Sequence, residues 1–290
     1  MSRIRSESAQ FQLLEALRHN RRKRTQRGEL LIEGVQAINR AIEHDWPIRA
    51  VLVPEGASLS SWARSVSGAC PDAEHHTVRP DLFARLADRE DVPELLLVGA
   101  IAEPALEELR PPADGIVVVV DRPSSPGNLG TIVRTSDALG AAAVLAVGHG
   151  AHLYDPRTVR ASVGSLFALP TLHVAGPAEL AAWLVGWQEQ VHVTVFATDE
   201  DGDVDVADLD GMDEVADDDD LDQTPAARRP SVLLLGTERT GLSRGLRDLA
   251  DVTVRIPMAG SASSLNVAVA HAIVLHALTR PARSSRDGGH

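Results

Sequence analysis

Apolar runs alternate with helical patterns along the second half of the chain. Residues 116–120, 143–147 and 232–235 are apolar throughout, which is typical of strands buried on both faces of a parallel sheet. Further strands are predicted over 169–174, 192–196 and 252–256. Apolar residues at helical spacing predict helices over 129–139, after Asp155 and Pro156, and over 178–186, 242–249 and 265–278. This alternation indicates an α/β domain with helices on both faces of a parallel sheet.

The first hundred residues show a mixed pattern that predicts a smaller α/β domain. Apolar residues recur at helical spacing from Phe11 to Leu17. The later elements are helices over 33–46, 60–66 and 80–86 and strands over 48–53 and 95–101. Pro111 and Pro112 mark a linker. The predicted organisation is an arm over 1–27, a small domain over 28–103, a linker over 104–114, a larger domain over 115–282 and a tail over 283–290.

Charge is distributed unevenly along the chain. Residues 199–222 contain fourteen Asp and Glu and no Lys or Arg, so the net charge of −13 becomes +1 for the remainder. We expect a disordered acidic insert over about 199–224 without a catalytic role, because such a segment buries too little apolar surface to fold. Residues 1–27 carry eight basic residues against two acidic ones. This arm is either a solvated tail or a phosphate-binding element whose RNA contacts are Arg21, Arg22, Lys23, Arg24 and Arg27.

Residue composition excludes several classes of protein. The single cysteine, Cys70, excludes a disulfide framework and a cysteine-based zinc cluster. The eleven histidines show no ligand spacing, so no metal is expected. No apolar run approaches the length of a membrane span, and no apolar leader follows the first residue. We therefore expect a cytoplasmic protein with no membrane partner.

Three blocks combine small residues with a few polar side chains at predicted strand-to-helix junctions. Small residues let the backbone approach a ligand closely, so these junctions predict a pocket. The glycine spacing in the first block does not match the dinucleotide-binding fingerprint, which argues against a hydride-transfer enzyme. The key residues are Asn128, Gly130 and Arg134 in the first block, Gly236, Glu238 and Gly241 in the second, and Pro257, Met258, Gly260, Ser264, Leu265 and Asn266 in the third.

In this order, the three blocks resemble the motifs of the SpoU (TrmH-like) family of S-adenosylmethionine-dependent RNA ribose 2′-O-methyltransferases. The resemblance covers roughly residues 115–278, and within the family the chain is most similar to the avilamycin-resistance type of 23S rRNA methyltransferase. It implies an α/β fold with a C-terminal SPOUT domain, whose parallel sheet contains a deep trefoil knot. It also implies a preceding small domain of the ribosomal-protein L30e type, and a homodimer.

The resemblance also implies roles for individual residues. Arg134 would orient the acceptor and stabilise charge first and act as general base second, because a guanidinium is a poor base. Asn128 would fix Arg134 or the ribose, and Glu238 would hold loop backbone or an arginine. Ser264 and Asn266 would bind the hydroxyl or a substrate phosphate. Arg122 and Arg160 are either RNA contacts or surface ion pairs. The S-adenosylmethionine contacts would be Leu235, Gly236, Thr237, Ile256, Pro257, Met258 and Leu265.

Three functions are compatible with these features. The first is 2′-O-methylation of 23S rRNA, with resistance to a ribosome-targeting antibiotic as a further role. The second is methylation of tRNA, which uses the same chemistry but is usually carried out by enzymes that lack a small preceding domain such as residues 28–103, the front domain. The third is a non-catalytic RNA-binding protein of ribosome assembly, against which the complete set of polar motif residues argues.

Overall fold

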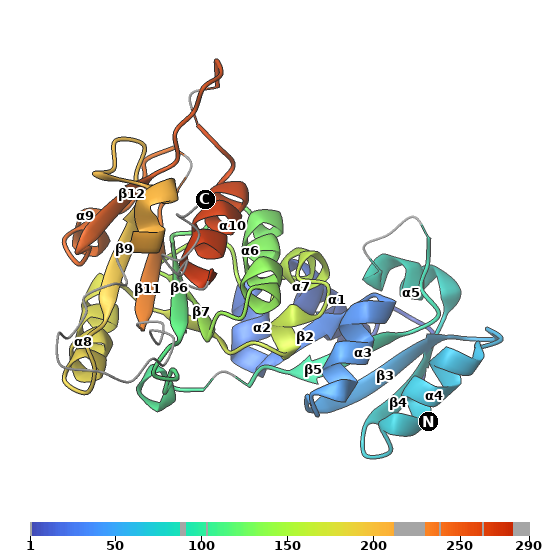
Figure 1. Ribbon diagram of the computed structural model, residues 1–290. Coiled ribbons are helices and arrows are strands. Elements are labelled where there is room, and N and C mark those ends of the chain that lie inside the picture. Colours follow the sequence, from blue (N-terminus) through green and yellow to red (C-terminus); the bar gives the residue numbers. More distant parts are fainter. Residues whose placement is uncertain are drawn as a thin grey trace, which may run out of the picture. The chain divides into compact units, whose positions relative to one another are not determined.

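The computed structural model describes residues 2–87, 91–102, 104–211, 230–237, 239–262 and 264–280. The chain divides into two compact units, and each contains one sheet (Figure 1). The first unit comprises residues 1–103, 125–134 and 151–169, and the second comprises 104–124, 135–150 and 170–290. Two segments of the predicted larger domain therefore belong to the first unit.

The first unit is built on a mixed five-stranded sheet with strand order β1-β4-β3-β5-β2. Strands β1, β4 and β3 are parallel, and β5 runs antiparallel to β3 and β2. The elements are β1 (Ser2–Ile4), α1 (Ala9–His19), α2 (Arg21–Arg27), β2 (Glu29–Ile32), α3 (Val35–Glu43), β3 (Ile48–Pro54), α4 (Ser61–Ala69), β4 (Glu74–Val78), α5 (Pro80–Leu86), β5 (Leu96–Ala100), the start of α6 (Pro126–Ala138), α7 (Pro156–Ala161) and η2 (Ser165–Phe167).

Residues 2–27 are folded parts of this unit and do not form a separate arm. The helix predicted near Phe11 to Leu17 is confirmed as α1, and both of these side chains are buried in the core. Both α1 and α2 begin with a side-chain N-cap. The Phe11 N–H donates to Ser8 Oγ at the start of α1, and the Lys23 N–H donates to Asn20 Oδ1 at the start of α2. The polar strand β4 and the short β1 were not predicted, because neither has an extended apolar run.

The second unit is built on a seven-stranded, fully parallel sheet with strand order β10-β12-β9-β11-β6-β7-β8. The strands predicted from apolar runs are all present within a few residues of their expected bounds. The elements are η1 (Leu106–Glu108), β6 (Ile116–Asp121), β7 (Ala143–Val147), β8 (Thr171–Val174), α8 (Pro177–Gln188), β9 (Thr194–Thr198), β10 (Val204–Asp205), η3 (Val206–Gly211), β11 (Ser231–Leu235), α9 (Arg244–Arg247), β12 (Val252–Arg255) and α10 (Val267–Thr279).

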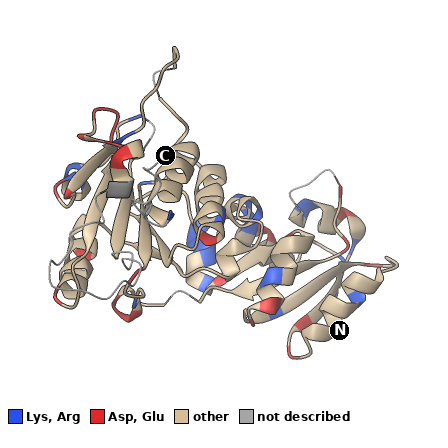
Figure 2. Cartoon of the chain, viewed as in Figure 1, with Lys and Arg blue, Asp and Glu red and all other residues tan. Residues whose placement is uncertain are grey.

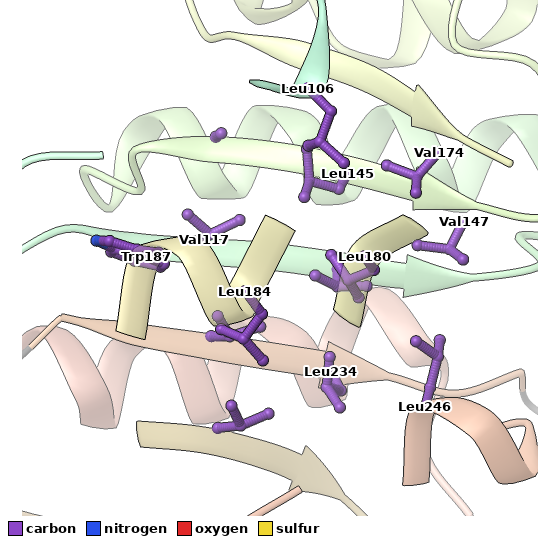
Figure 3. Close-up of a cluster of buried hydrophobic side chains, with 14 of the residues drawn as sticks. Leu106, Val117, Leu145, Val147, Val174, Leu180, Leu184, Trp187, Leu234 and Leu246 are labelled. Atoms are coloured by element: carbon purple, nitrogen blue, oxygen red, sulfur yellow. The ribbon is translucent and has the colours of Figure 1, made fainter. Parts of the chain in front are cut away.

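Side chains cover both faces of this parallel sheet. Every residue of β6, β7 and β11 is buried, which explains why these strands are apolar throughout. Figure 3 shows one face, where Leu180 and Leu184 of α8 pack over the central strands. The helix α10 packs against β11 on the other face. The predicted α/β fold with a parallel sheet is confirmed.

The first half of the predicted acidic insert is folded. Strand β10 pairs with β12, and the Leu209 side chain in η3 is only 3% exposed. Gly202 packs so closely that a Cβ atom there would lie 2.6 Å from the carbonyl carbon of Val254. The prediction of disorder over 199–224 is therefore wrong for residues 199–211, where a few apolar anchors outweigh the charge. Residues 212–224 lie outside the described residues.

Candidate functional site

The second unit contains a cavity at the carboxyl ends of three neighbouring strands. Strands β9, β11 and β12 are adjacent and parallel, so the loops that follow them meet at one edge of the sheet. The cavity has a volume of about 320 Å³, and it is lined by residues from all three loops and by Val267 and Ala270 of α10. Loops at this edge are the usual ligand-binding position in parallel α/β sheets.

The loop after β11 is closed on itself by backbone hydrogen bonds. The Thr237 N–H donates to the Gly241 carbonyl at 3.1 Å, and the Gly241 N–H donates to the Thr237 carbonyl at 3.0 Å. A Cβ atom on Gly236 would lie 2.5 Å from the Gly241 carbonyl carbon, and Gly241 has φ of +60°. Both positions therefore require glycine. Gly236 and Thr237 line the cavity, whereas Glu238 lies outside the described residues.

A buried carboxylate holds this loop to the end of β6. Asp121 is 2% exposed and accepts a hydrogen bond from the Ser243 N–H at 2.6 Å. The Arg122 guanidinium binds both Asp121 oxygens at 3.0 Å and donates to the Gly241 carbonyl at 3.4 Å. These hydrogen bonds raise the pKa of Arg122. Arg122 was expected to be either an RNA contact or a surface ion pair, and it forms an ion pair with Asp121 that holds the loop. Its φ of 43° is a strained conformation.

The loop after β12 contributes the third wall of the cavity. Ile256, Met258, Ser264 and Leu265 line the cavity. Pro257 is exposed and is not among the lining residues. Leu235, another predicted cofactor contact, is fully buried within β11 and is not among the lining residues. Asn266 is the N-cap of α10, and its Oδ1 accepts the Ala268 N–H at 2.9 Å.

Residues that the sequence did not indicate form the remaining wall. Thr198, Asp199, Glu200 and Asp201 line the cavity, and Arg247 of α9 does so beside Asp199, 3.9 Å away. The acidic residues were expected to belong to the disordered insert. Their position directly after a parallel strand was the available signal, because carboxyl ends of such strands face ligand sites.

The helix α6 carries Asn128 and Arg134, which belong to the first unit together with α7. Arg134 is exposed, and Asn128 is half-buried near the start of the helix. A Cβ atom on Gly130 would lie 2.4 Å from the Thr158 carbonyl oxygen and 2.7 Å from the Ala161 Cβ. The motif glycine therefore permits close packing of α6 on α7.

The end of α6 is fixed to α10 by a buried hydrogen bond within the second unit. Ser136 Oγ lies 3.1 Å from His271 Nε2, and both residues are fully buried. His271 Nδ1 has no hydrogen-bond partner among the described residues. Burial lowers the pKa of His271 to about 4, so the imidazole is neutral near pH 7. The neutral ring and Ser136 together connect α6 to α10.

The RNA-binding residues that were predicted among positions 21–27 differ in how exposed their side chains are. Arg22 and Lys23 are exposed and Arg21 is half-buried. Arg24 is 2% exposed, and its guanidinium donates to the carbonyl of Leu17 at 2.8 Å. The prediction that Arg24 contacts RNA is therefore wrong, because its hydrogen-bonding groups are directed inward. Arg27 forms an ion pair with Glu29, 2.5 Å away.

Within the described ranges, no group of three or more His, Cys, Asp or Glu side chains could hold a metal ion. None of the described helices has the length and apolar character to span a membrane.

Comparison with known proteins identifies relatives along the whole chain. Residues 115–276 match the SpoU rRNA methylase family, and residues 8–97 match the SpoU L30e-like domain. The 23S rRNA (uridine(2479)-2′-O)-methyltransferase of Streptomyces viridochromogenes is 40% identical over 286 residues, which cover 98% of this chain and 94% of that protein. The 23S rRNA (guanosine(2553)-2′-O)-methyltransferase RlmP of Bacillus subtilis is 25% identical over 90% of this chain and 92% of its own.

Solved structures that are similar to this chain are also methyltransferases. The crystal structure of the SpoU methyltransferase AviRb from Streptomyces viridochromogenes with the cofactor AdoMet has a TM-score of 0.83 and 40% identity, covering 94% of this chain and 97% of that chain. The AdoMet-bound rRNA methyltransferase from Sinorhizobium meliloti has a TM-score of 0.76 and 26% identity, covering 95% of this chain and 97% of that chain.

Proposed function

Because the chain belongs to the SpoU rRNA methylase family, we propose that it is an enzyme that methylates a ribose 2′-hydroxyl in 23S rRNA with S-adenosylmethionine. The observation that carries the proposal is the cavity at the carboxyl ends of β9, β11 and β12. The motif blocks that suggested the family from the sequence supply two of its three walls.

The residues of the cavity fit an adenosine with an attached amino acid. Ile256, Leu265 and Val267 offer an apolar wall for a ring, and Gly236 and Gly241, which also line the cavity, leave room for a ligand to approach the backbone. Gly236, Thr237, Ile256, Met258 and Leu265 would hold the cofactor, which supplies an electrophilic methyl group when bound. Leu235 and Pro257 would act indirectly, by supporting and shaping the two loops.

The acceptor side of the reaction requires orientation of the ribose and removal of a proton. We assign Arg134 to orienting the RNA and stabilising charge, since its guanidinium can bind a phosphate with two parallel hydrogen bonds. Asn128 and Glu238 would position Arg134 or loop backbone, and Ser264 and Asn266 would bind the hydroxyl or a phosphate. Positioning of this kind contributes on the order of 7 kcal/mol to catalysis.

A 23S rRNA substrate is favoured over tRNA by the extent of the similarity. Two relatives named as 23S rRNA 2′-O-methyltransferases align over 90% or more of this chain, including the front domain. This substrate implies a cytoplasmic location. The motif blocks of this chain resemble those of the avilamycin-resistance type, and protection of the ribosome against such an antibiotic is the further role that we propose.

Mapping ribose methylation tests the proposal directly. Purified protein, tritiated S-adenosylmethionine and 23S rRNA should give label at one ribose, located by primer extension at low nucleotide concentration. The same site should lack methylation in cells without the protein. Label on bulk tRNA and none on 23S rRNA would show that the substrate is tRNA. Cofactor and RNA binding without any transfer of label would favour the non-catalytic alternative.

A further inference from the structure

We propose that α2, α7 and Arg134 of α6 form one continuous surface of the first unit that binds the phosphodiester backbone of the substrate RNA. This inference rests on the proposed function, because it identifies where the RNA presented for methylation would be held. All three elements belong to the same unit, although α7 and α6 lie more than a hundred residues after α2 in the sequence. Figure 2 shows basic residues on both α2 and α7.

The buried Arg24 connects α2 to α7. Its guanidinium donates to the carbonyls of Leu17 and Arg18, at 2.8 and 3.1 Å, and lies 3.3 Å from Asp155 Oδ2. Asp155 is the N-cap of α7 and accepts the backbone N–H of Arg157 at 3.0 Å. One internal arginine therefore fixes the position of α7 relative to α2. The Arg157 guanidinium also donates to Asp155, at 3.0 and 3.4 Å, but its side chain stays 60% exposed.

The cations on the two helices act in the same electrostatic environment. Burial lowers the pKa of Arg24, the Asp155 carboxylate opposes this shift, and the positive charges of Arg157 and Arg21 add to it. Arg21 from α2 and Arg157 from α7 are therefore both close enough to Arg24 for their charges to lower its pKa. Burial by itself would raise the pKa of Asp155, but hydrogen bonds from Arg157 lower it, so the carboxylate stays ionised and is occupied internally.

The surface cations greatly outnumber the acidic groups on these elements. Arg22, Lys23 and Arg157 are exposed, and Arg21 and Arg160 are half-buried. The one carboxylate between the helices, Asp155, has a side chain only 14% exposed. Guanidinium groups match phosphate oxygens in geometry, so a row of arginines fits a nucleic-acid backbone better than it fits an isolated carboxylate.

Helix α6 extends this surface to the predicted catalytic arginine. Gly130 allows α6 to touch the last turn of α7 at Thr158 and Ala161, next to Arg160. Arg134 follows Gly130 by four residues, so it lies on the same side of α6, about 6 Å along the helix. The cations of α2 and α7 thus lead to the group assigned to the acceptor ribose. Phosphate contacts along this surface would position the RNA without any reading of its sequence.

Salt dependence of RNA binding tests this surface. Two double variants remove exposed charge, Arg22→Gln with Lys23→Gln on α2 and Arg157→Gln with Arg160→Gln on α7. A matched control removes two exposed arginines elsewhere on the same unit, Arg3→Gln with Arg64→Gln. Binding of a 23S rRNA fragment is measured by fluorescence anisotropy over a range of salt. Each of the first two variants should flatten the log–log slope by about 1.4, at about 0.7 per lost phosphate contact.

The outcomes separate the surface from the proposed function. Flattening by both variants and none by the control supports one continuous surface. An unchanged salt-dependence slope for the α7 variant would overturn the proposal of one continuous surface. Equal flattening of the slope by the control variant would also overturn it. Calorimetry with S-adenosylmethionine should give the wild-type affinity for all three variants, which shows that the second unit is intact. Wild-type protein that binds the fragment with the expected slope but methylates no RNA would refute the proposed function and leave the surface standing.

Discussion

Arg134 is the residue on which the proposed chemistry depends most directly. It is exposed on α6, one turn after the contact between α6 and α7. Replacement by alanine removes the acceptor-side cation without altering the cavity residues of the second unit. We expect Arg134→Ala to lose at least 100-fold in methyl transfer, about the size of one lost transition-state hydrogen-bond donor, while the affinity for S-adenosylmethionine stays within a few-fold.

A tritiated-methyl assay and calorimetry on the same preparation measure these two quantities. Arg134→Lys is the informative companion variant, because it keeps the charge but loses the forked geometry. Loss of cofactor binding in Arg134→Ala, with RNA binding retained, would contradict the assignment to the acceptor side.

Gly236 offers a separate test of the cofactor pocket. A methyl group at this position would collide with the backbone of Gly241 and Leu242, at 2.5 and 2.6 Å, so the loop that lines the cavity must shift. We expect Gly236→Ala to weaken S-adenosylmethionine binding at least tenfold, measured by calorimetry. Gly186→Ala is the control, since no atom lies within 4 Å of the added carbon in α8. Wild-type affinity in Gly236→Ala would exclude the loop from the binding site.

His271 makes stability depend on pH. Its pKa is lowered by burial to about 4 in the folded protein, against about 6.5 in the unfolded chain. The unfolded state therefore binds more protons between these values, so the stability present above pH 6.5 is lost as pH falls towards 4. The total is about 3 kcal/mol, of which about 2 kcal/mol is lost by pH 5.

Urea unfolding at pH 7 and pH 5 measures this loss. The double variant His271→Leu with Ser136→Ala removes the titrating group and its hydrogen-bond partner together, so the difference between the two pH values should shrink by about 2 kcal/mol. Equal pH dependence in the wild type and the double variant would show that His271 titrates normally.

At the scale of elements, η3 shows that the acidic segment contributes to folding. Leu209 is buried and η3 packs against α10. We expect Leu209→Ala to lower the free energy of unfolding by about 2–4 kcal/mol, as for other buried leucines. Asp208→Ala, at an exposed neighbouring position, is the control and should change stability by less than about 0.5 kcal/mol. Chemical denaturation of both variants distinguishes a packed segment from a solvated one.

The elements that the sequence predicted best are those buried on both faces. Residues 143–147 were predicted as a strand and form β7 with the same bounds, because continuous burial demands continuous apolar character. The strand β4 (Glu74–Val78) was missed, since its residues are mostly polar and its pairing partners are set by distant segments. The acidic cavity residues 199–201 were missed for a different reason, because they were attributed to the acidic insert on charge alone.

Individual contacts were less predictable than elements. Five basic residues among positions 21–27 look equivalent in sequence, yet Arg24 is buried and bound to Asp155, 131 residues later. No local pattern encodes such a partner. The same holds for the contact between the Arg122 guanidinium and the Gly241 carbonyl, 119 residues later.

At the scale of the whole molecule, we expect a homodimer formed through α10. Val269 and Ile273 of this helix are 48% and 37% exposed, one turn apart on one side. Apolar residues repeated in this way on an exposed helix face favour a symmetric contact with a second copy. Light scattering at micromolar concentration should give twice the chain mass of 30.9 kDa.

The double variant Val269→Asp with Ile273→Asp should convert the dimer to a folded monomer, because both side chains lie at the surface of the chain. An active wild-type monomer at the same concentration would exclude the dimer. The deep trefoil knot implied by the family resemblance stays a prediction.

The packing of residues 151–169 on the first unit has a consequence for how such proteins evolve. The Trp46 ring lies 5.1 Å from Phe167 and 6.5 Å from Tyr154, and Gly164 leaves no room for a side chain beside Arg40. A gene fusion that joined residues 1–103 to a different catalytic domain would leave this aromatic cluster incomplete and Arg24 without Asp155. The front domain therefore cannot be exchanged freely between proteins. Recombination at the linker gives a completely packed front domain only when the incoming catalytic domain contains a segment that matches residues 151–169.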